Sequence, residues 1–281
     1  MPITLNLLPH TEPLLTVHQT DHQQPDNLCG PYCLSLLLRA YGALSVNAVD
    51  VAIAASTVLP SNGNPTDWLP PNASSLQSKN YHHISTHPNL NICGTSITGL
   101  IYATKILSKG KFSLIPLQIA DWQTGLAKIL KLCHTQPAIP LLNPHTSYFW
   151  GTHPSPLTLI SYLDSKQISP PPTDWSVGHF NLLIGAAHQE PQTLYTLLDT
   201  YPQFGWQGLH FQPAAALSQS LHRPKQTTQG GLALFIKTEL RPEIENLVLG
   251  EGFNISVWDN GSPVGPIEEP TPQTLPRGEI G

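Results

Sequence analysis

The sequence predicts an α+β fold, with helices in the first half of the chain and an antiparallel sheet in the second. Up to about residue 133, apolar residues recur at helical spacing. After residue 178, short apolar runs bounded by turn-forming residues are typical of strands. Hydrophobic residues make up 40% of the 281 residues and occur in compact runs, which excludes a disordered chain.

The best-defined helix is predicted over residues 30–41. This segment is hydrophobic almost all round, as a central buried helix would be. Pro31 suits the first turn of a helix, and Gly42 suits the position just past its end. Further helices are expected over residues 47–58, 95–109 and 121–133, the last beginning at an aspartate N-cap.

Strands are expected mainly in the second half of the chain. The expected strands are residues 112–117, 138–142, 178–187, 193–198, 208–211 and 231–237. A polar turn at residues 189–192 predicts that the strands on either side of it form a hairpin. The two strand ends remote from this turn are therefore expected to lie side by side.

Three segments are expected to have little regular structure. Residues 1–28 contain several prolines, so we expect an extended arm over residues 1–22 that leads into the domain at residue 23. Residues 60–92 are rich in Pro, Asn, Ser and His and predict a long loop. The Pro- and Gly-rich residues 250–281 predict a flexible tail, which leaves one domain over residues 23–249.

The composition excludes several classes of function. Charged residues are only 11% of the chain, the net charge is −5, and no basic block is present, so nucleic acid is not an expected partner. No apolar stretch is long enough to cross a bilayer, and the N-terminus lacks the features of a signal peptide. Four cysteines are too few for a disulfide framework, which favours reduced thiols in the cytoplasm. The oligomeric state has no sequence signal.

Cys29 is the first candidate for chemistry, because it directly precedes a predicted helix. The positive end of a helix and its unpaired N–H groups stabilise a thiolate and a neighbouring oxyanion. Gly30 allows close backbone approach, and Pro31 begins the helix without wasting an N–H donor. Taken alone, Cys29 is equally well explained as a buried structural cysteine.

A nucleophilic cysteine needs a base, and the base needs a residue that orients it. His179 begins the first strand of the predicted hairpin, and Asp199 follows the second strand, so the hairpin predicts that they are neighbours. Taken alone, His179 is more simply a hydrogen-bonded core histidine. An amide side chain is also expected as an oxyanion donor, and either Gln23 or Gln24 could reach the start of the helix.

Two motifs carry a resemblance to a known family. Residues 23–42 read Gln-x5-Cys-Gly-Pro-x-Cys-Leu-x6-Tyr-Gly, which resembles the first motif of the papain-like peptidases that remove double-glycine leaders from bacteriocin precursors (peptidase C39-like). His179-Phe180, an apolar strand and Leu-Leu-Asp199 resemble the second motif. The resemblance covers roughly residues 20–240. It implies a papain-like fold with Cys29 as nucleophile, His179 as base, Asp199 as its orienting residue and Gln23 as oxyanion donor.

The chain departs from the family pattern at two places. Leu28 stands where the family usually has an acidic residue, and the nearest acid is Asp26. Thr200 follows the orienting aspartate where the family usually has proline. The segments at 60–92 and 250–281 are additional to the family pattern.

The resemblance implies a cysteine-dependent hydrolase that cleaves a peptide or amide bond through an acyl-enzyme, without a cofactor or metal. An acyltransferase or peptide cyclase could use the same residues, and a non-catalytic peptide-binding module could keep the same fold. A soluble protein without any site is the simplest alternative. Two metal or redox alternatives are the pair Cys29 and Cys33 and the cluster His82, His83, His87 and Cys93; neither has the spacing of a closed metal site.

Overall fold

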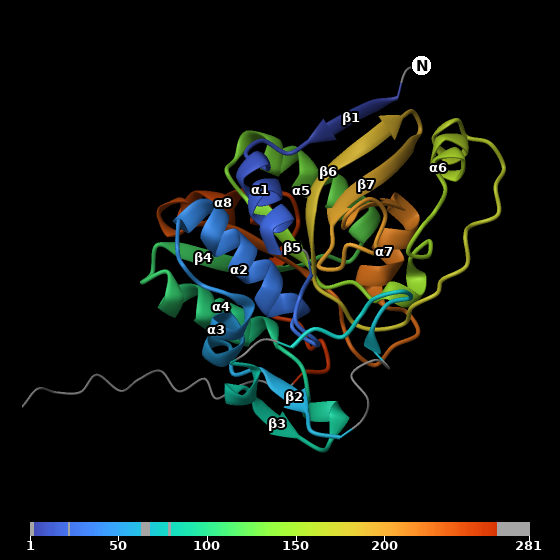
Figure 1. The fold of residues 1–281 in the computed structure, drawn as a ribbon. Helices are drawn as coiled ribbons and strands as arrows, with labels where there is room; N and C mark the ends of the chain where they lie inside the picture. The colour runs from blue at the N-terminus through green and yellow to red at the C-terminus, as the bar shows by residue number, and fades with distance from the viewer. Residues whose placement is uncertain (1–2, 22, 63–67, 78–79, 263–281) are drawn as a thin grey trace, which may run out of the picture.

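The computed structural model describes residues 3–21, 23–62, 68–77 and 80–262 (Figure 1). The α+β class is confirmed, since these residues form eight α-helices and a large antiparallel sheet. The helices are α1 Glu12–Asp21, α2 Cys29–Gly42, α3 Ala48–Ala54, α4 Ile97–Leu107, α5 Trp122–Thr135, α6 Pro156–Leu163, α7 Ala214–His222 and α8 Arg241–Gly250. The strands are β1 Thr4–Leu7, β2 Val58–Pro60, β3 Ser85–His87, β4 Phe112–Gln118, β5 Ile139–Leu142, β6 Asn181–Gln189, β7 Gln192–Leu198, β8 Leu209–Pro213, β9 Leu232–Lys237 and β10 Asn254–Ile255.

The large sheet has the strand order β10-β4-β9-β5-β6-β7-β8, and β1 pairs with the outer half of β6. Neighbouring strands are antiparallel throughout. The β6–β7 hairpin is the longest pairing, with Leu182 opposite Leu198 at its open end and Gln189 opposite Gln192 at its turn. This is the hairpin that the polar turn predicted. The short strands β2 and β3 form a separate parallel pair.

The sheet is buried on both faces. Successive residues of a strand point to opposite sides, so Leu182 joins the core cluster under α1–α4, whereas Leu183 joins the cluster under α5, α7 and α8. Leu114 and Ile115 of β4 divide in the same way. Burial on both faces explains why these strands read as continuous apolar runs although the sheet is antiparallel.

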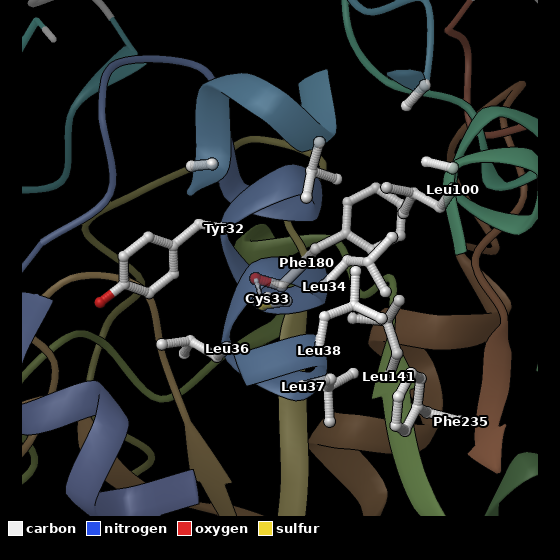
Figure 2. Packing of buried hydrophobic residues seen from close by; sticks show 14 of the residues in the cluster. Tyr32, Cys33, Leu34, Leu36, Leu37, Leu38, Leu100, Leu141, Phe180 and Phe235 are labelled. Atoms are coloured by element: carbon white, nitrogen blue, oxygen red, sulfur yellow. Dashed lines mark hydrogen bonds between the residues drawn. The ribbon is translucent and has the colours of Figure 1, made fainter. Parts of the chain in front are cut away.

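Helix α2 lies at the centre of the first layer. Its residues from Gly30 to Leu38 are all buried, and each fully buried leucine contributes roughly 1.5–3 kcal/mol relative to an exposed one. Figure 2 shows Leu34 and Leu38 of this helix close to Phe180 and other side chains of the core. The helix includes Gly42, and Ala43 takes the left-handed conformation at φ 49°, one residue later than the predicted end.

Both termini contain more structure than the sequence predicted. Residues 12–21 form α1 instead of an extended arm, because Leu14 is fully buried in the core cluster of α2. At the other end, Phe253 and Trp258 are buried and β10 pairs with β4, so the tail expected from residue 250 is packed on the domain as far as the structure describes it. The remainder of the predicted tail, residues 263–281, lies outside the described residues.

Other differences concern elements that the sequence pattern did not reveal. The helix expected over residues 47–58 ends at Ala54, and residues 58–60 become β2. The predicted 60–92 loop includes β3 and two short 3-10 helices; residues 63–67 and 78–79 of it lie outside the described residues. Helices α6, α7 and α8 were not predicted. No helix in the described part of the chain has the length and apolar character needed to span a bilayer.

Candidate active site

Cys29 is the first residue of α2 and is half-buried. Leu28 precedes it with φ −110°, and no side chain caps this end of the helix. Because Pro31 has no N–H, the N–H groups of Cys29 and Gly30 are the first-turn donors left free by the described residues. These donors and the helix dipole favour negative charge on or beside the thiol.

A close contact between α2 and the segment before β6 fixes Cys29 next to His179. A Cβ atom on Gly30 would lie 3.0 Å from Cδ2 of Phe180, so only glycine lets the helix start approach this ring without displacing it. Cys33 lies one turn further along α2, and its thiol donates to the Phe180 carbonyl oxygen at a distance of 3.6 Å. The Cys-Gly-Pro-x-Cys sequence therefore positions both the thiol and the backbone that carries the histidine.

His179 is buried, and its backbone and ring are both held in place. Its N–H donates to the carbonyl oxygen of Pro144 at 3.0 Å, and its own carbonyl oxygen accepts from Nδ2 of Asn143 at 3.3 Å. The imidazole packs edge-on against Trp175, with ring centroids 4.9 Å apart, and nearly parallel to Tyr201 at 6.1 Å. These contacts leave the ring little freedom to turn.

Asp199 follows β7 at the open end of the hairpin and is buried beside His179. Its Oδ1 and Oδ2 lie 3.1 and 3.0 Å from Nε2 of His179. Oδ1 also accepts from the N–H of Tyr201 at 3.0 Å. Because Nε2 faces the carboxylate, Nδ1 is the ring nitrogen left for the hydrogen bond between His179 and Cys29. The structure thus brings together the three residues that the sequence singled out as nucleophile, base and orienting residue.

His179 and Asp199 carry opposite charges. Burial alone would lower the pKa of His179, but the charge of Asp199 and the hydrogen bonds with Asp199 and Cys29 raise it to about 10. Burial alone would raise the pKa of Asp199, but the charge and hydrogen bonds of His179, together with the nearby His210, hold it below the ordinary value. By contrast, burial and the nearby Cys29 and Asp199 raise the pKa of Cys33, so this thiol stays protonated. At neutral pH, His179 and Asp199 therefore form a buried ion pair.

Residues just before Cys29 form hydrogen bonds with the loop at residues 74–76. The amide of Gln23 donates from Nε2 to the carbonyl oxygen of Ser74 at 2.6 Å. The carboxylate of Asp26 is buried and accepts from the N–H of Leu76 at 3.0 Å. The structure therefore directs the Gln23 side chain to the loop and not to the triad, and its role as oxyanion donor stays a prediction.

Gln24, the other amide that the sequence offered, is buried behind the triad. Its Nε2 donates to the hydroxyl of Tyr201 at 3.0 Å, and its Oε1 accepts from the hydroxyl of Thr200 at 2.5 Å. Oγ1 of Thr200 also lies 3.4 Å from Nε2 of His179. Gln24 therefore anchors the two residues that follow Asp199. In the sequence, Thr200 stands out only as a departure from a family pattern, and nothing local to it signals this contact.

A cavity of about 370 Å³ lies beside Cys29. Its lining comes from segments far apart in the chain: Asn27, Cys29, Pro60, Trp68, Leu90, Cys93, Gly94, Thr95, Asn143, Ser176, Val177, Gly178, Phe180, Asn260, Gly261 and Ser262. None of these described residues is acidic, basic or histidine. A Cβ on Gly94 would fall within 2.3 Å of Oγ of Ser262, so two distant segments touch directly at this wall. The cavity is neutral and mixes apolar with polar side chains.

The alternative metal cluster does not form a common site. Within the described chain, no three His, Cys, Asp or Glu side chains are grouped so that they could hold a metal ion. Nδ1 of His87 accepts from the N–H of Asn89 at 3.0 Å, and the thiol of Cys93 lies 3.3 Å from the carbonyl oxygen of Asn89. The rings of His82 and His83 pack on each other with centroids 4.0 Å apart. These contacts shape the loop.

Comparison with known proteins places the chain in a family. Residues 8–259 match a family of unknown function, DUF6885. The chain belongs to this family. The DUF6885 match includes Cys29, His179 and Asp199, together with Gln23 and every strand of the large sheet except β1. No curated protein matches the chain.

Proposed function

We propose that this protein is a cysteine-dependent hydrolase with a Cys29–His179–Asp199 triad that cleaves a peptide or amide bond. The observation that carries the proposal is the buried imidazole of His179, which bridges a carboxylate and a thiol at a helix N-terminus. This is the arrangement that activates a cysteine nucleophile, because the imidazolium stabilises the thiolate and the carboxylate stabilises the imidazolium. Papain-like architecture and kinship with the double-glycine leader peptidases belong to the same proposal, and the two sequence motifs support them.

The reaction follows from the atoms present. The Cys29 thiolate forms a bond to the carbonyl carbon of the substrate, and the carbonyl electron pair moves to the oxygen. The free N–H groups of Cys29 and Gly30 donate hydrogen bonds to this oxyanion, since the Gln23 amide is directed at Ser74. When the tetrahedral adduct collapses, the amine leaves with the proton from Nδ1 of His179. A water that gives a proton back to Nδ1 then releases the acyl group and restores the thiolate.

The cavity favours an uncharged substrate segment. Apart from Cys29 itself, none of the described lining residues could pair with a charged substrate side chain, so burying such a side chain there would be costly. We therefore propose substrates whose residues next to the cleaved bond are uncharged. If an amine or thiol replaced water as the acceptor, the same residues would give an acyltransferase or cyclase.

Alkylation of Cys29 tests the proposed ion pair. We would measure the rate with iodoacetamide between pH 5 and 9 for the wild type, His179→Gln and Cys29→Ala, and locate the label by mass spectrometry. Cys29 should react far below the free-thiol pKa of about 8.5, and His179→Gln should slow it by on the order of 100-fold at pH 6. Cys93 lines the same cavity and provides an internal control.

Turnover requires a second measurement. A library of peptides with uncharged residues is incubated with the wild type, and the covalent acyl-enzyme on Cys29 is sought by mass spectrometry of the intact protein. An acyl adduct that forms on the wild type and is absent from Cys29→Ala supports the hydrolase. Alkylation that titrates like an ordinary thiol and does not depend on His179 would instead favour the peptide-binding module.

A further inference from the structure

A second histidine reaches the triad carboxylate. Nε2 of His210 lies 3.6 Å from Oδ2 of Asp199, and both side chains are completely buried. The same oxygen lies 3.0 Å from Nε2 of His179. Asp199 therefore stands between two imidazoles, of which only His179 was visible in the sequence pattern.

The fold fixes His210 at this place. It lies on β8 opposite Leu197 of β7, and its ring packs against Phe149 and Phe204 with centroids 5.7 and 5.0 Å away. A Cβ on Gly205 would lie 2.7 Å from Cβ of His210, so the neighbouring turn closes tightly over it. Neither ring nitrogen has a hydrogen-bond partner of ordinary length among the described residues. An apolar residue would fill this aromatic pocket at no polar cost, so packing alone does not explain a histidine here.

The other titratable groups near Asp199 carry no positive charge. Burial raises the pKa of Tyr32, Cys33 and Tyr201, and the charge of Asp199 raises each further, so all three are neutral. Among the residues that the structure describes, the two imidazoles and the N–H of Tyr201 are the groups that offset the buried carboxylate charge. An N–H on Nε2 of His210 would place its positive end beside Oδ2.

We propose that His210 is a positioning residue of the triad, which holds Asp199 ionised and oriented toward His179 by presenting an Nε2–H to Oδ2. This inference rests on the proposed function. His210 acts on the thiol only through Asp199 and His179, and no proton is transferred to or from it. Without this N–H, the carboxylate loses one of its stabilising donors and supports the His179 imidazolium less well.

Two substitutions separate hydrogen bonding from packing. His210→Gln keeps an amide N–H near the position of Nε2, whereas His210→Leu keeps a similar volume without a donor. We expect His210→Leu to lower the pKa of His179 by on the order of one unit, measured by NMR of labelled imidazoles, and to reduce Cys29 alkylation at pH 6 relative to pH 9 by on the order of tenfold. His210→Gln should stay within about threefold of the wild type.

A double variant shows whether the effect passes through Asp199. With Asp199→Asn already present, His210→Leu should cause no further loss of alkylation. An equal loss in the presence and absence of Asp199, or a larger loss in His210→Gln than in His210→Leu, would overturn the proposal in favour of packing. If His210→Leu shifts the pKa of His179 while the wild type cleaves no peptide, the inference about His210 holds and the hydrolase proposal fails.

The wild type offers a test that does not depend on any variant. The nitrogen shifts of His210 report which ring nitrogen carries the proton in its neutral form. We expect the proton on Nε2, facing Asp199. A neutral ring protonated on Nδ1, with a bare Nε2 toward the carboxylate, would overturn the proposal.

Discussion

Each end of the β6–β7 hairpin holds a histidine, and the two histidines have opposite surroundings. At the open end, His179 is fully buried against the carboxylate of Asp199. Near the turn, His188 is half-buried, and its Nδ1 lies 3.0 Å from the hydroxyl of Thr193. Burial lowers the pKa of His188, whereas Asp199 overcomes the same effect of burial and raises the pKa of His179. The partner across the hairpin, and not strand position, decides whether the imidazole carries charge.

The difference between the two histidines also bears on the role of the open end of the hairpin. Removing two charges from water costs free energy, and the attraction between the charges often does not compensate for this cost. A buried ion pair therefore contributes little to the free energy of unfolding by itself. The pair at the open end lies beside a thiol at a helix N-terminus, where a shifted pKa is useful for catalysis. The turn end has no such neighbour and uses a neutral hydrogen bond.

Replacing the residue that contacts each histidine, Asp199 at the open end and Thr193 at the turn, should give the largest difference in Cys29 alkylation. Asp199→Asn keeps the shape but removes the charge, so the imidazolium of His179 and with it the Cys29 thiolate lose their support. We expect Cys29 alkylation at pH 6 to fall by on the order of 100-fold or more. The matched change at the turn, Thr193→Val, should leave the alkylation rate within about twofold. Equal effects of the two substitutions would contradict the proposed role of the carboxylate.

The pH dependence of the free energy of unfolding should reflect the titration of His179 and Asp199 at the open end of the hairpin. The folded pKa of His179, about 10, is above the ordinary 6.5, so its contribution to the free energy of unfolding is complete below pH 6.5 and is lost as the pH rises toward 10. For Asp199 the pKa is lowered, so its contribution is present above about pH 4 and is lost in acid. A Cys29 thiolate in the proposed ion pair takes up a proton on unfolding below about pH 8.5, which offsets the proton that His179 loses. Urea unfolding should therefore show the His179 decline, on the order of 1 kcal/mol per pH unit, above pH 8.5.

A variant without the imidazole provides the control for this pH profile. The raised pKa of the buried thiols Cys33 and Cys133 gives a decline above about pH 8.5 in both proteins, so His179→Gln should make the alkaline decline shallower by on the order of 1 kcal/mol per pH unit. His188 has a lowered pKa, so its contribution runs the other way and is lost as the pH falls through 6.5. An equally steep alkaline decline in the wild type and in His179→Gln would assign it to other groups.

A smaller effect is expected where α2 meets Phe180. The Cβ of Gly30→Ala would lie 3.0 Å from the Phe180 ring, which pushes the start of the helix away from the open end of the hairpin. We expect a loss of roughly 1–3 kcal/mol in urea unfolding and slower Cys29 alkylation. Gly250→Ala is the matched control, because no atom lies within 4 Å of its added Cβ and it ends a helix. It should be neutral or slightly stabilising; equal losses in both variants would exclude the proposed contact.

The smallest effect is expected for Gln23→Ala. Its amide bonds the Ser74 carbonyl, so the substitution should remove one partly exposed hydrogen bond worth roughly 0.5–1.5 kcal/mol. Alkylation of Cys29 should stay within about threefold of the wild type. Peptide cleavage provides the decisive measurement: a fall of on the order of 100-fold with unchanged alkylation would return the oxyanion role to Gln23.

The parts of the site that depend on local sequence pattern could be predicted from the sequence. The helix after Cys29 is marked by its apolar run and by Pro31, and the hairpin is marked by two apolar strands around a polar turn. Antiparallel pairing then places the residue before one strand next to the residue after the other, so His179 and Asp199 could be paired without knowing the rest of the sheet.

The remaining parts depend on contacts between distant segments. His210 is recognisable only when the register of β7 with β8 is known, because its own strand is short. Gln24 and Thr200 are hydrogen-bonded but 176 residues apart in the sequence, and no local pattern links them. Helix α1 is only ten residues long and contains threonines and histidine, which are poor helix formers, so its formation depends on burying Leu14.

The contact between Gly94 and Ser262 in the cavity wall has a consequence for the order in which the parts of the site are synthesised. Cys29 is made 150 residues before His179 and 170 residues before Asp199, and Ser262 follows later still. A nascent chain that displays only Cys29 therefore lacks the charges of the His179–Asp199 pair and this part of the cavity wall. The surroundings of the thiol are complete only after residue 262 has been made.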